Sequence, residues 1–310
     1  MTRDPKRAAS EAMASKSVIW PNSSSTPRRA WEHSPLAPVS ARPPLSEYLH
    51  QLWDRRHFIL LHARSQSLGQ HQGTFLGRAW LVLGPLLDGL VYWLIFGLAF
   101  NLQRTVPGFI PRLLVGILLF SYFSRGLTTM ANSLSAGRGL IRAFSFPRAS
   151  LPIAAILRET YSAVPMVLTL LAMILVVPPG AVPTSTWLLL PFPLVLIGLF
   201  TTGIGFFMAR LVSIIPDVSK LLSYVLRFAL YGSGVIFSVE RFTDHPVITA
   251  VLTINPVYIF IEMARELLLH DTIPGPGRWL MLTAWAIVFL ILGLVYFWRG
   301  EADYGKQRVA

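Results

Sequence analysis

The hydrophobic residues of this chain gather into long runs that short polar segments separate. A helix needs about 20 residues to cross a hydrocarbon core of about 30 Å, and helices are expected because lipid cannot satisfy backbone polar groups. The pattern therefore predicts an all-α membrane protein with six transmembrane helices. Their expected positions are about 79–101, 111–133, 150–177, 187–212, 220–239 and 278–298.

Residues 45–78, before the first run, show a different pattern. Apolar residues recur at helical spacing over about 46–66, while charged residues occupy most of the other faces. This pattern predicts an amphipathic helix at the membrane–water interface, followed by a short approach to the first span. A small helix packed on a soluble partner is the alternative.

A short apolar stretch also precedes the last run. Residues 257–269, which follow Asn255 and Pro256, are too few to span and predict a re-entrant or external helix. Glu262 and Arg265 on this helix are spaced for an ion pair, so its polar face is expected to meet water.

Composition supports a membrane class and excludes some chemistry. Hydrophobic residues make up 53% of the 310 residues and charged residues 14%, whereas soluble domains carry about a quarter charged residues. The lack of cysteine excludes disulfide frameworks, cysteine zinc sites and thiol nucleophiles. No metal site is predicted.

The net charge of +12 comes mostly from the N-terminal arm and from short loops beside the runs. That distribution is typical of cytoplasmic flanks and argues against a nucleic-acid partner. Lys and Arg number 11 before the first span and three in 134–149, whereas 178–186 has none. The positive-inside rule therefore predicts that both termini are cytoplasmic.

Four regions follow from these patterns. Residues 1–44 are rich in Pro and Ser and are expected to be a disordered cytoplasmic arm. Residues 45–78 form the interfacial helix and approach, 79–298 the six-helix membrane domain, and 299–310 a cytoplasmic tail.

Five ionisable residues interrupt the predicted spans. Each lies about eight to nine residues from the cytoplasmic end of its helix, which is a depth of about 12–14 Å. Charges at this depth are costly unless paired or wetted. Two acids and three bases allow two ion pairs and leave one arginine to snorkel or to face an anionic ligand; a structural ion-pair layer is the alternative. The five residues are Asp88, Arg125, Arg158, Glu159 and Arg227.

Common catalytic motifs are missing from the sequence. It contains no G-x-x-x-x-G-K-[ST], so the chain is not expected to bind ATP. It also lacks H-E-x-x-H and G-x-S-x-G. A membrane-embedded glycosyltransferase remains an alternative, because such enzymes can use dispersed Asp or Arg residues.

Three segments resemble the ABC-2 permeases that export polysaccharides, a family that includes O-antigen, capsule, teichoic-acid and mycobacterial-type galactan exporters. The resemblance covers about residues 45–310, and the Pro-rich arm departs from it. The segments are the approach to the first helix (Ser67-Leu68-Gly69, Leu76 to Trp80, Leu83 to Leu86 and Ile95-Phe96-Gly97), the loop Gly139 to Arg148 with Leu151-Pro152, and Asn255-Pro256-Val257-Tyr258 through Arg265.

The resemblance implies the membrane subunit of an ATP-driven exporter in the bacterial plasma membrane, rather than an enzyme. The cargo would be a lipid-linked polysaccharide, and the chain would form a homodimer in contact with membrane lipids. Two copies of a separate P-loop ATPase would bind ATP and Mg, so this chain would hold no cofactor itself. An ABC-2 permease for a drug or a small lipid is the first rival.

Three sets of residues acquire roles from the resemblance. The loop between the second and third helices would contact the ATPase, with an aromatic side chain seated in a cleft; its arginines could instead simply follow the positive-inside bias. Aromatic residues of helices one, two and five would offer ring faces to sugars, although such residues also face lipid or pack. The helix before the last span would act as an external gate. The coupling set is Arg138, Leu140, Ile141, Arg142, Phe144, Phe146, Pro147 and Arg148; the channel set is Tyr92, Trp93, Tyr122, Phe123 and Tyr224; the gate set is Asn255, Pro256, Glu262 and Arg265.

Overall fold

The computed structural model describes a helical chain, and the described residues contain no strand. The all-α prediction is therefore confirmed. The chain divides into units Met1–Ala41 and Arg42–Ala310, and the first lies outside the described residues, as does nearly all of the predicted arm. The described residues are 43–69, 79–95, 108–144, 146–177, 182–235, 246–302 and 304.

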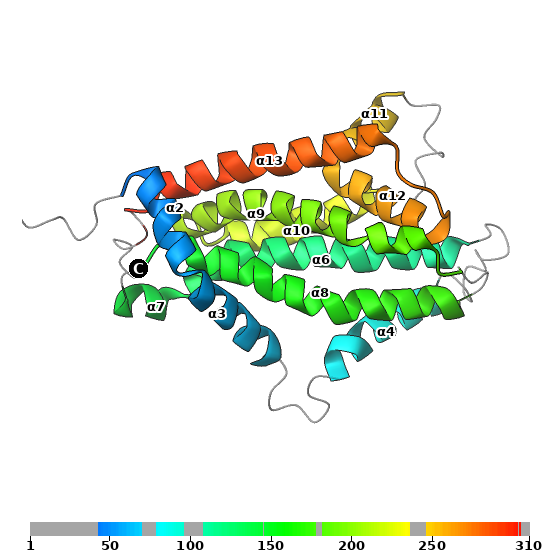
Figure 1. Cartoon of the computed structure of the whole chain (residues 1–310), viewed down its shortest axis with the longest axis horizontal. Coiled ribbons are helices and arrows are strands. Elements are labelled where there is room, and N and C mark those ends of the chain that lie inside the picture. The colour runs from blue at the N-terminus through cyan, green and yellow to red at the C-terminus, as the bar shows by residue number, and fades with distance from the viewer. Residues whose placement is uncertain are drawn as a thin grey trace, which may run out of the picture. The chain divides into compact units, whose positions relative to one another are not determined.

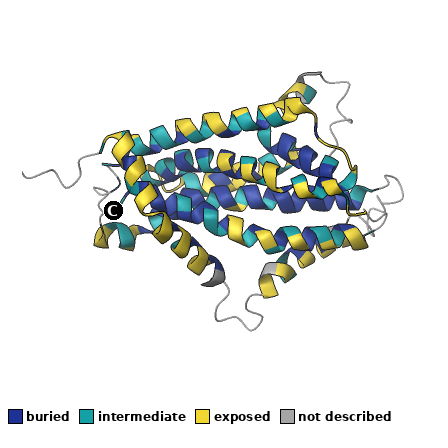
Figure 2. Ribbon diagram, viewed as in Figure 1, coloured by how far each residue is buried: buried dark blue, intermediate teal, exposed yellow. Residues whose placement is uncertain are grey.

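Among the described residues, four helices are long and apolar enough to cross a membrane. They are α6 (Phe109–Ala136), α8 (Ser150–Val176), α9 (Pro191–Ile214) and α13 (Pro276–Arg299), and they run lengthwise beside one another (Figure 1). Helix α6 is buried along most of its length and lies at the centre of the bundle (Figure 2). Four of the six predicted spans thus correspond to long helices.

The first and fifth predicted spans are described in part. Helix α4 (Trp80–Tyr92) packs on α8, and residues 96–101 of that span lie outside the described residues. Helix α10 (Val218–Gly232) packs on α6 and ends before the predicted limit at 239. Its 15 residues are about 22 Å long, less than a hydrocarbon core. The helix ends at Gly232, where a turn follows, and the span limit at 239 stays a prediction because 236–245 lie outside the described residues.

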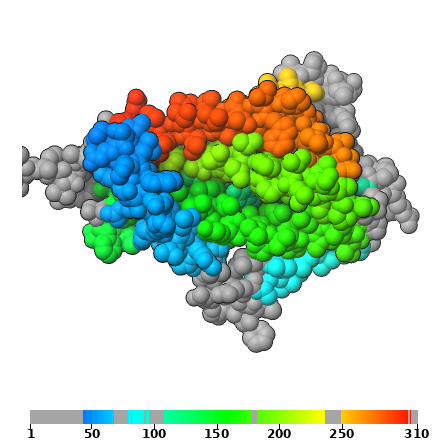
Figure 3. Space-filling view, in the orientation of Figure 1, coloured from blue at the N-terminus to red at the C-terminus, as the bar shows by residue number. Residues whose placement is uncertain are grey.

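The predicted interfacial helix consists of two helices, α2 (Leu45–Asp54) and α3 (Arg56–Gly69). The helix breaks at Arg55, whose φ of −89° and ψ of 8° fall in the bridge region between helix and strand. Helix α3 packs along α8, and the Ser67 hydroxyl lies 3.1 Å from that of Ser162. Figure 3 shows α2 and α3 against the outside of the bundle at one end.

Two short helices precede the last span, and the second corresponds to the single helix predicted at 257–269. They are α11 (Pro246–Ile254) and α12 (Pro256–Leu269). Asn255 separates them and caps α12, because its side-chain oxygen accepts the Val257 N–H at 2.9 Å. Helix α12 packs on α6, α9 and α13 and is largely buried.

The short elements divide between the two ends of the bundle (Figure 1). One end holds α2, α7 (Arg138–Ala143) and residues 299–302, and we call it the basic end. The opposite end holds α11, α12 and the 3-10 helix η4 (Ser185–Leu189). This division matches the alternation of loops that the span prediction requires.

Helices α9 and α13 approach each other most closely at two glycines. A Cβ atom on Gly203 would overlap the backbone of Phe289, and one on Gly293 would overlap the backbone of Gly203. Small residues allow such backbone contact between membrane helices. The rings of Phe200 and Phe289, with centroids 5.3 Å apart, fill the space beside it.

Candidate functional site

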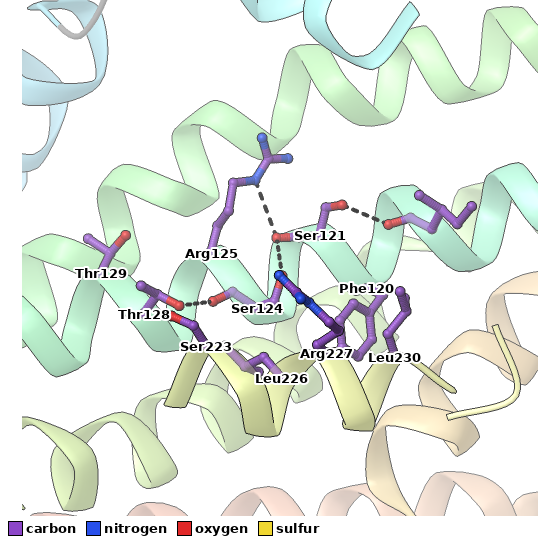
Figure 4. Close-up of a pocket in the computed structure, with 11 residues that line it drawn as sticks. Phe120, Ser121, Ser124, Arg125, Thr128, Thr129, Ser223, Leu226, Arg227 and Leu230 are labelled. Carbon is purple, nitrogen blue, oxygen red and sulfur yellow. Dashed lines mark hydrogen bonds between the residues drawn. The ribbon is translucent and has the colours of Figure 1, made fainter. Parts of the chain in front are cut away.

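A cavity of about 450 Å³ lies between α6 and α10 (Figure 4). Its lining residues on α6 recur at intervals of three and four, which places them on one face of the helix. The lining is Ile117, Phe120, Ser121, Ser124, Arg125, Thr128, Thr129, Ser223, Leu226, Arg227 and Leu230. Hydroxyl groups and two guanidinium groups therefore meet in a part of the bundle that is otherwise apolar.

Three hydroxyl groups on this face of α6, those of Ser121, Ser124 and Thr128, donate within their own helix. Ser121 donates to the Ile117 carbonyl at 2.8 Å, and Thr128 donates to the Ser124 carbonyl at 2.8 Å. Each hydroxyl oxygen keeps acceptor capacity after it has donated its hydrogen. The face can consequently accept hydrogen bonds from a polar ligand without leaving unsatisfied donors when the cavity is empty.

Arg125 and Arg227 bring two positive charges to this cavity. Arg125 donates through Nε to the Ser121 carbonyl at 3.3 Å, and its Nη2 lies 3.2 Å from the Met166 sulfur. The Arg227 guanidinium lies 5.9 Å from the centre of the Tyr224 ring. Neither arginine has a carboxylate within 4 Å among the described residues. Two arginines with only weak partners can bind an anionic group.

The other predicted intramembrane charges lie on two further helices. Arg158 and Glu159 on α8 form an ion pair at 2.9 Å, and Arg158 also donates to the Thr129 hydroxyl at 3.3 Å. Thr129 in turn donates to Glu159 at 3.2 Å and lines the cavity. Asp88 on α4 is exposed and has no described cation in ion-pair range. Among the described residues, these five charges thus form one ion pair where the sequence allowed two.

The predicted channel aromatics of α6 lie in the core. Tyr122 is 5% exposed, and its hydroxyl lies 3.1 Å from that of Thr160 on α8. Phe123 is equally buried and stacks on Phe200 of α9, with ring centroids 6.3 Å apart. Their face of α6 points toward α8 and α9 rather than toward the cavity. The cavity lining does include Phe120, which we did not predict; this ring is also 5% exposed and packs edge-on against Phe123.

The remaining predicted aromatics differ in position. Tyr224 is exposed on α10 beside Arg227, next to the cavity. Trp93 is exposed at the end of α4. The side chain of Tyr92 lies outside the described residues.

The predicted coupling loop divides into an outward and an inward set. Arg138, Arg142 and Phe144 are exposed, and the Phe144 ring is 65% exposed. The other residues of the loop are buried or half-buried at the basic end. They are Leu140, Ile141, Phe146, Pro147 and Arg148. The aromatic residue that is free to contact a partner is thus Phe144 rather than Phe146.

Two of the predicted gate residues donate hydrogen bonds to carbonyls at and just after the C-terminal end of α10. Asn255 donates to the Gly232 carbonyl at 3.1 Å, and Arg265 donates to the Gly234 and Val235 carbonyls at 2.9 and 3.0 Å. The Gly232 carbonyl is the last of α10 and has no partner within the helix, and those of Gly234 and Val235 follow it, so Asn255 and Arg265 supply their partners. Helix α12 thereby fixes one wall of the cavity.

The predicted ion pair on α12 is present but does not meet water. Arg265 lies 2.6 Å from Glu262, and the two residues are 1% and 8% exposed. The expectation that this face meets water is wrong because Arg265 faces backbone carbonyls inside the bundle. Arg112 at the start of α6 also pairs with Glu262 at 3.4 Å.

A polar cluster around Glu301 at the basic end was not predicted from the sequence. Glu301 is 8% exposed and accepts hydrogen bonds from the Tyr48 hydroxyl at 2.8 Å and the Arg148 backbone N–H at 2.9 Å. Burial raises the pKa of the Glu301 carboxyl, and the Arg148 N–H and the Tyr48 hydroxyl oppose that rise. Desolvation also raises the pKa of Tyr48. The one sequence signal was an acidic residue directly after the last apolar run.

Comparison with known proteins places the chain among transporter subunits. Residues 59–269 match the family model described as ABC-2 type transporter. The O-antigen export system permease protein RfbA of Myxococcus xanthus is 25% identical over 263 residues, which are 84% of this chain and 96% of that protein. A protein of the same name from Klebsiella pneumoniae is 23% identical over 206 residues, 66% of this chain and 77% of that protein.

The family match extends from α3 through α12 and so includes both walls of the cavity, the α7 loop and the gate residues. The resemblance seen in the three sequence segments is therefore confirmed over more than half of the chain. With its four long apolar helices, the chain is a multi-pass membrane protein that belongs to the ABC-2 type transporter family.

Proposed function

We propose that this chain is the membrane-spanning subunit of an ATP-driven exporter that moves a lipid-linked polysaccharide across the bacterial plasma membrane. The names of the relatives support a polysaccharide cargo. The observation that carries the proposal is the cavity between α6 and α10, where hydroxyl groups and two arginines line one face.

The chemistry of the cavity suits such a cargo. A glycan chain presents many hydroxyl groups, which the acceptor oxygens of Ser121, Ser124 and Thr128 can bind. A phosphate group between glycan and lipid is an anion that guanidinium groups bind in a bidentate manner. Arg125 and Arg227 would bind this group, and the Phe120 ring would contact a sugar face.

The proposed topology has six spans with both termini in the cytoplasm. Helices α4 and α10 would belong to the first and fifth spans, and their described parts are short. The basic end would face the cytoplasm, where Lys and Arg are retained. Helices α2 and α3 would lie at the inner membrane surface, and α12 would gate the outer end of the passage.

The proposed assembly contains two copies of this chain and two copies of a separate ATPase. Arg125, Ser223 and Arg227 on the cavity wall are exposed, so a second copy could close the open side into a passage. The exposed Phe144 and the arginines of α7 would contact the ATPase. The ATPase would bind ATP and Mg, and this chain would bind no cofactor.

Reconstitution into liposomes tests this proposal. We expect the chain and its copurified ATPase to transport a lipid-linked glycan when ATP is supplied, and we expect Arg125→Gln with Arg227→Gln to abolish transport. Movement of a small lipid or drug but no glycan would favour the rival permease. Sugar transfer by the chain alone, with no ATPase copurified, would favour a glycosyltransferase.

A further inference from the structure

The carboxyl group of Glu301 joins three segments that are far apart in the sequence. Its Oε2 accepts the Tyr48 hydroxyl of α2, and its Oε1 accepts the backbone N–H of Arg148, which precedes α8. The Arg148 guanidinium also donates to the Glu301 carbonyl. The Tyr48 oxygen accepts the Ala149 N–H at 3.1 Å, which closes the cluster.

These contacts are buried and complementary. Tyr48, Ala149 and Glu301 are 1%, 0% and 8% exposed, so each donor depends on its partner rather than on water. The indole N–H of Trp298 donates to the Pro43 carbonyl at 3.1 Å and adds a further link between α13 and the start of α2. Glu301, which follows α13, is therefore built into the basic end.

The Glu301 cluster lies beside the loop that connects α7 to α8. The loop from Phe144 to Ala149 leads from the exposed part of α7 to the first turn of α8. Helix α8 carries Arg158 and Glu159, which contact Thr129 on the cavity wall. It also packs along α3. A displacement of the loop can thus reach the cavity through α8, provided that the loop and its neighbours move together.

We propose that Glu301 and Tyr48 are positioning residues that join α2, the start of α8 and the end of α13 into one unit, so that movement at α7 is transmitted to the cavity. This inference rests on the proposed function, in which an ATPase acts on α7. Without the cluster, the loop would move independently of α2 and α13, and part of each ATPase cycle would produce no transport.

The substitution Glu301→Gln tests the cluster with little change in size. An amide offers one acceptor, so its NH₂ group would face either the Arg148 N–H or the Tyr48 hydroxyl hydrogen, and both of these are donors. Tyr48→Phe deletes the hydroxyl group that donates to Glu301 and that accepts the Ala149 N–H. We expect either variant to raise the ATP hydrolysed per glycan exported about fivefold, a typical coupling effect. The ATPase should still copurify with both.

Glu47→Gln is the matched control, because Glu47 is exposed and precedes Tyr48 on α2. It should leave the ratio unchanged. The double variant Tyr48→Phe with Glu301→Gln should show a smaller rise than the two single effects combined, because both variants remove the Tyr48–Glu301 contact while each also disturbs one contact of its own. An unchanged ratio in either folded single variant, or an equal rise in Glu47→Gln, would overturn the inference.

Hydrogen exchange on the purified chain separates this inference from the proposed function. Glu301→Gln should speed amide exchange both in residues 146–149 and in α2, whatever the cargo is. Unchanged exchange in α2 would overturn the link even if export were normal. Failure of the unsubstituted chain to export glycan would instead contradict the proposed function, and the exchange result would still decide whether the link exists.

Discussion

The helix pairs α9–α13 and α6–α10 both lie within the membrane domain, but the residues at which the two helices of each pair meet differ in size and polarity. Helices α9 and α13 meet through the backbones of Gly203 and Gly293, with aromatic rings beside them. Helices α6 and α10 meet around hydroxyl groups, Arg125 and Arg227, and a cavity remains between them. One pair is dry and closely packed, whereas the other leaves room for a polar ligand.

This difference suggests a division of labour. Backbone contact leaves no room for sliding or separation, so α9 and α13 are suited to be a rigid support. Charges and hydroxyl groups in lipid are retained where they have a function. We therefore expect substitutions in the first pair to affect folding and substitutions in the second to affect transport.

The largest effect is expected at the close contact. Gly203→Ala and Gly293→Ala each place a methyl group against backbone atoms that cannot move aside, which should destabilise the protein by about 1–3 kcal/mol or more. Thermal unfolding in detergent measures this loss. Gly84→Ala on α4 is the control, because a Cβ there meets nothing within 4 Å. Equal stability of all three variants would contradict the close packing.

The next effect concerns the charges of the cavity. Hydrogen bonds to a charged group contribute about 1.5–3 kcal/mol, so Arg227→Gln should lower the initial rate of glycan export about tenfold or more. Its thermal stability should change little. Lys220→Gln removes an exposed charge from the same helix and should leave export unchanged. Full export by Arg227→Gln would show that the cavity charge is dispensable.

The reactivity of introduced cysteines tests whether water reaches the α6–α10 cavity but not the packed interior around α9. Ser223 on α10 and Thr201 on α9 both donate to the carbonyl four residues earlier, but Ser223 lines the cavity and Thr201 is 0% exposed. The chain has no cysteine of its own. A charged thiol reagent should therefore modify Ser223→Cys in native membranes and spare Thr201→Cys. Similar rates of modification at both positions would contradict the expected difference in water access.

The smallest effects separate two aromatic residues at the basic end. Phe146 is half-buried against the hydrophobic residues of the basic end, which include Tyr48, Leu151 and Phe297, so Phe146→Ala should cost about 1–2 kcal/mol of stability, less than for a fully buried ring. Phe144→Ala should leave stability unchanged and weaken copurification of the ATPase. The reverse pattern would assign the docking role to Phe146.

Sequence patterns predicted the features that depend on composition along a single segment. The long apolar runs gave the positions of α6, α8, α9 and α13, because length and hydropathy alone define a span. Arg125 and Arg227 stood out because a charge within an apolar run is rare. Both line the cavity.

The features that depend on packing between helices could not be predicted. Phe120 and Phe123 are one turn apart on α6, and only the arrangement of neighbouring helices decides which one lines the cavity. The partner of Glu301 is 253 residues away in the sequence. The early end of α10 depends on carbonyl contacts from Asn255 and Arg265, which lie on a different segment.

Photo-crosslinking tests most directly whether the cavity is the route of the glycan. A photoreactive phenylalanine analogue would replace Phe120 in the cavity wall or Phe289 at the α9–α13 contact, in membranes that contain the ATPase and the lipid-linked glycan. We predict ATP-dependent crosslinks to the glycan from position 120 and none from position 289. Crosslinks from neither position while export proceeds, or from both equally, would contradict the proposed route.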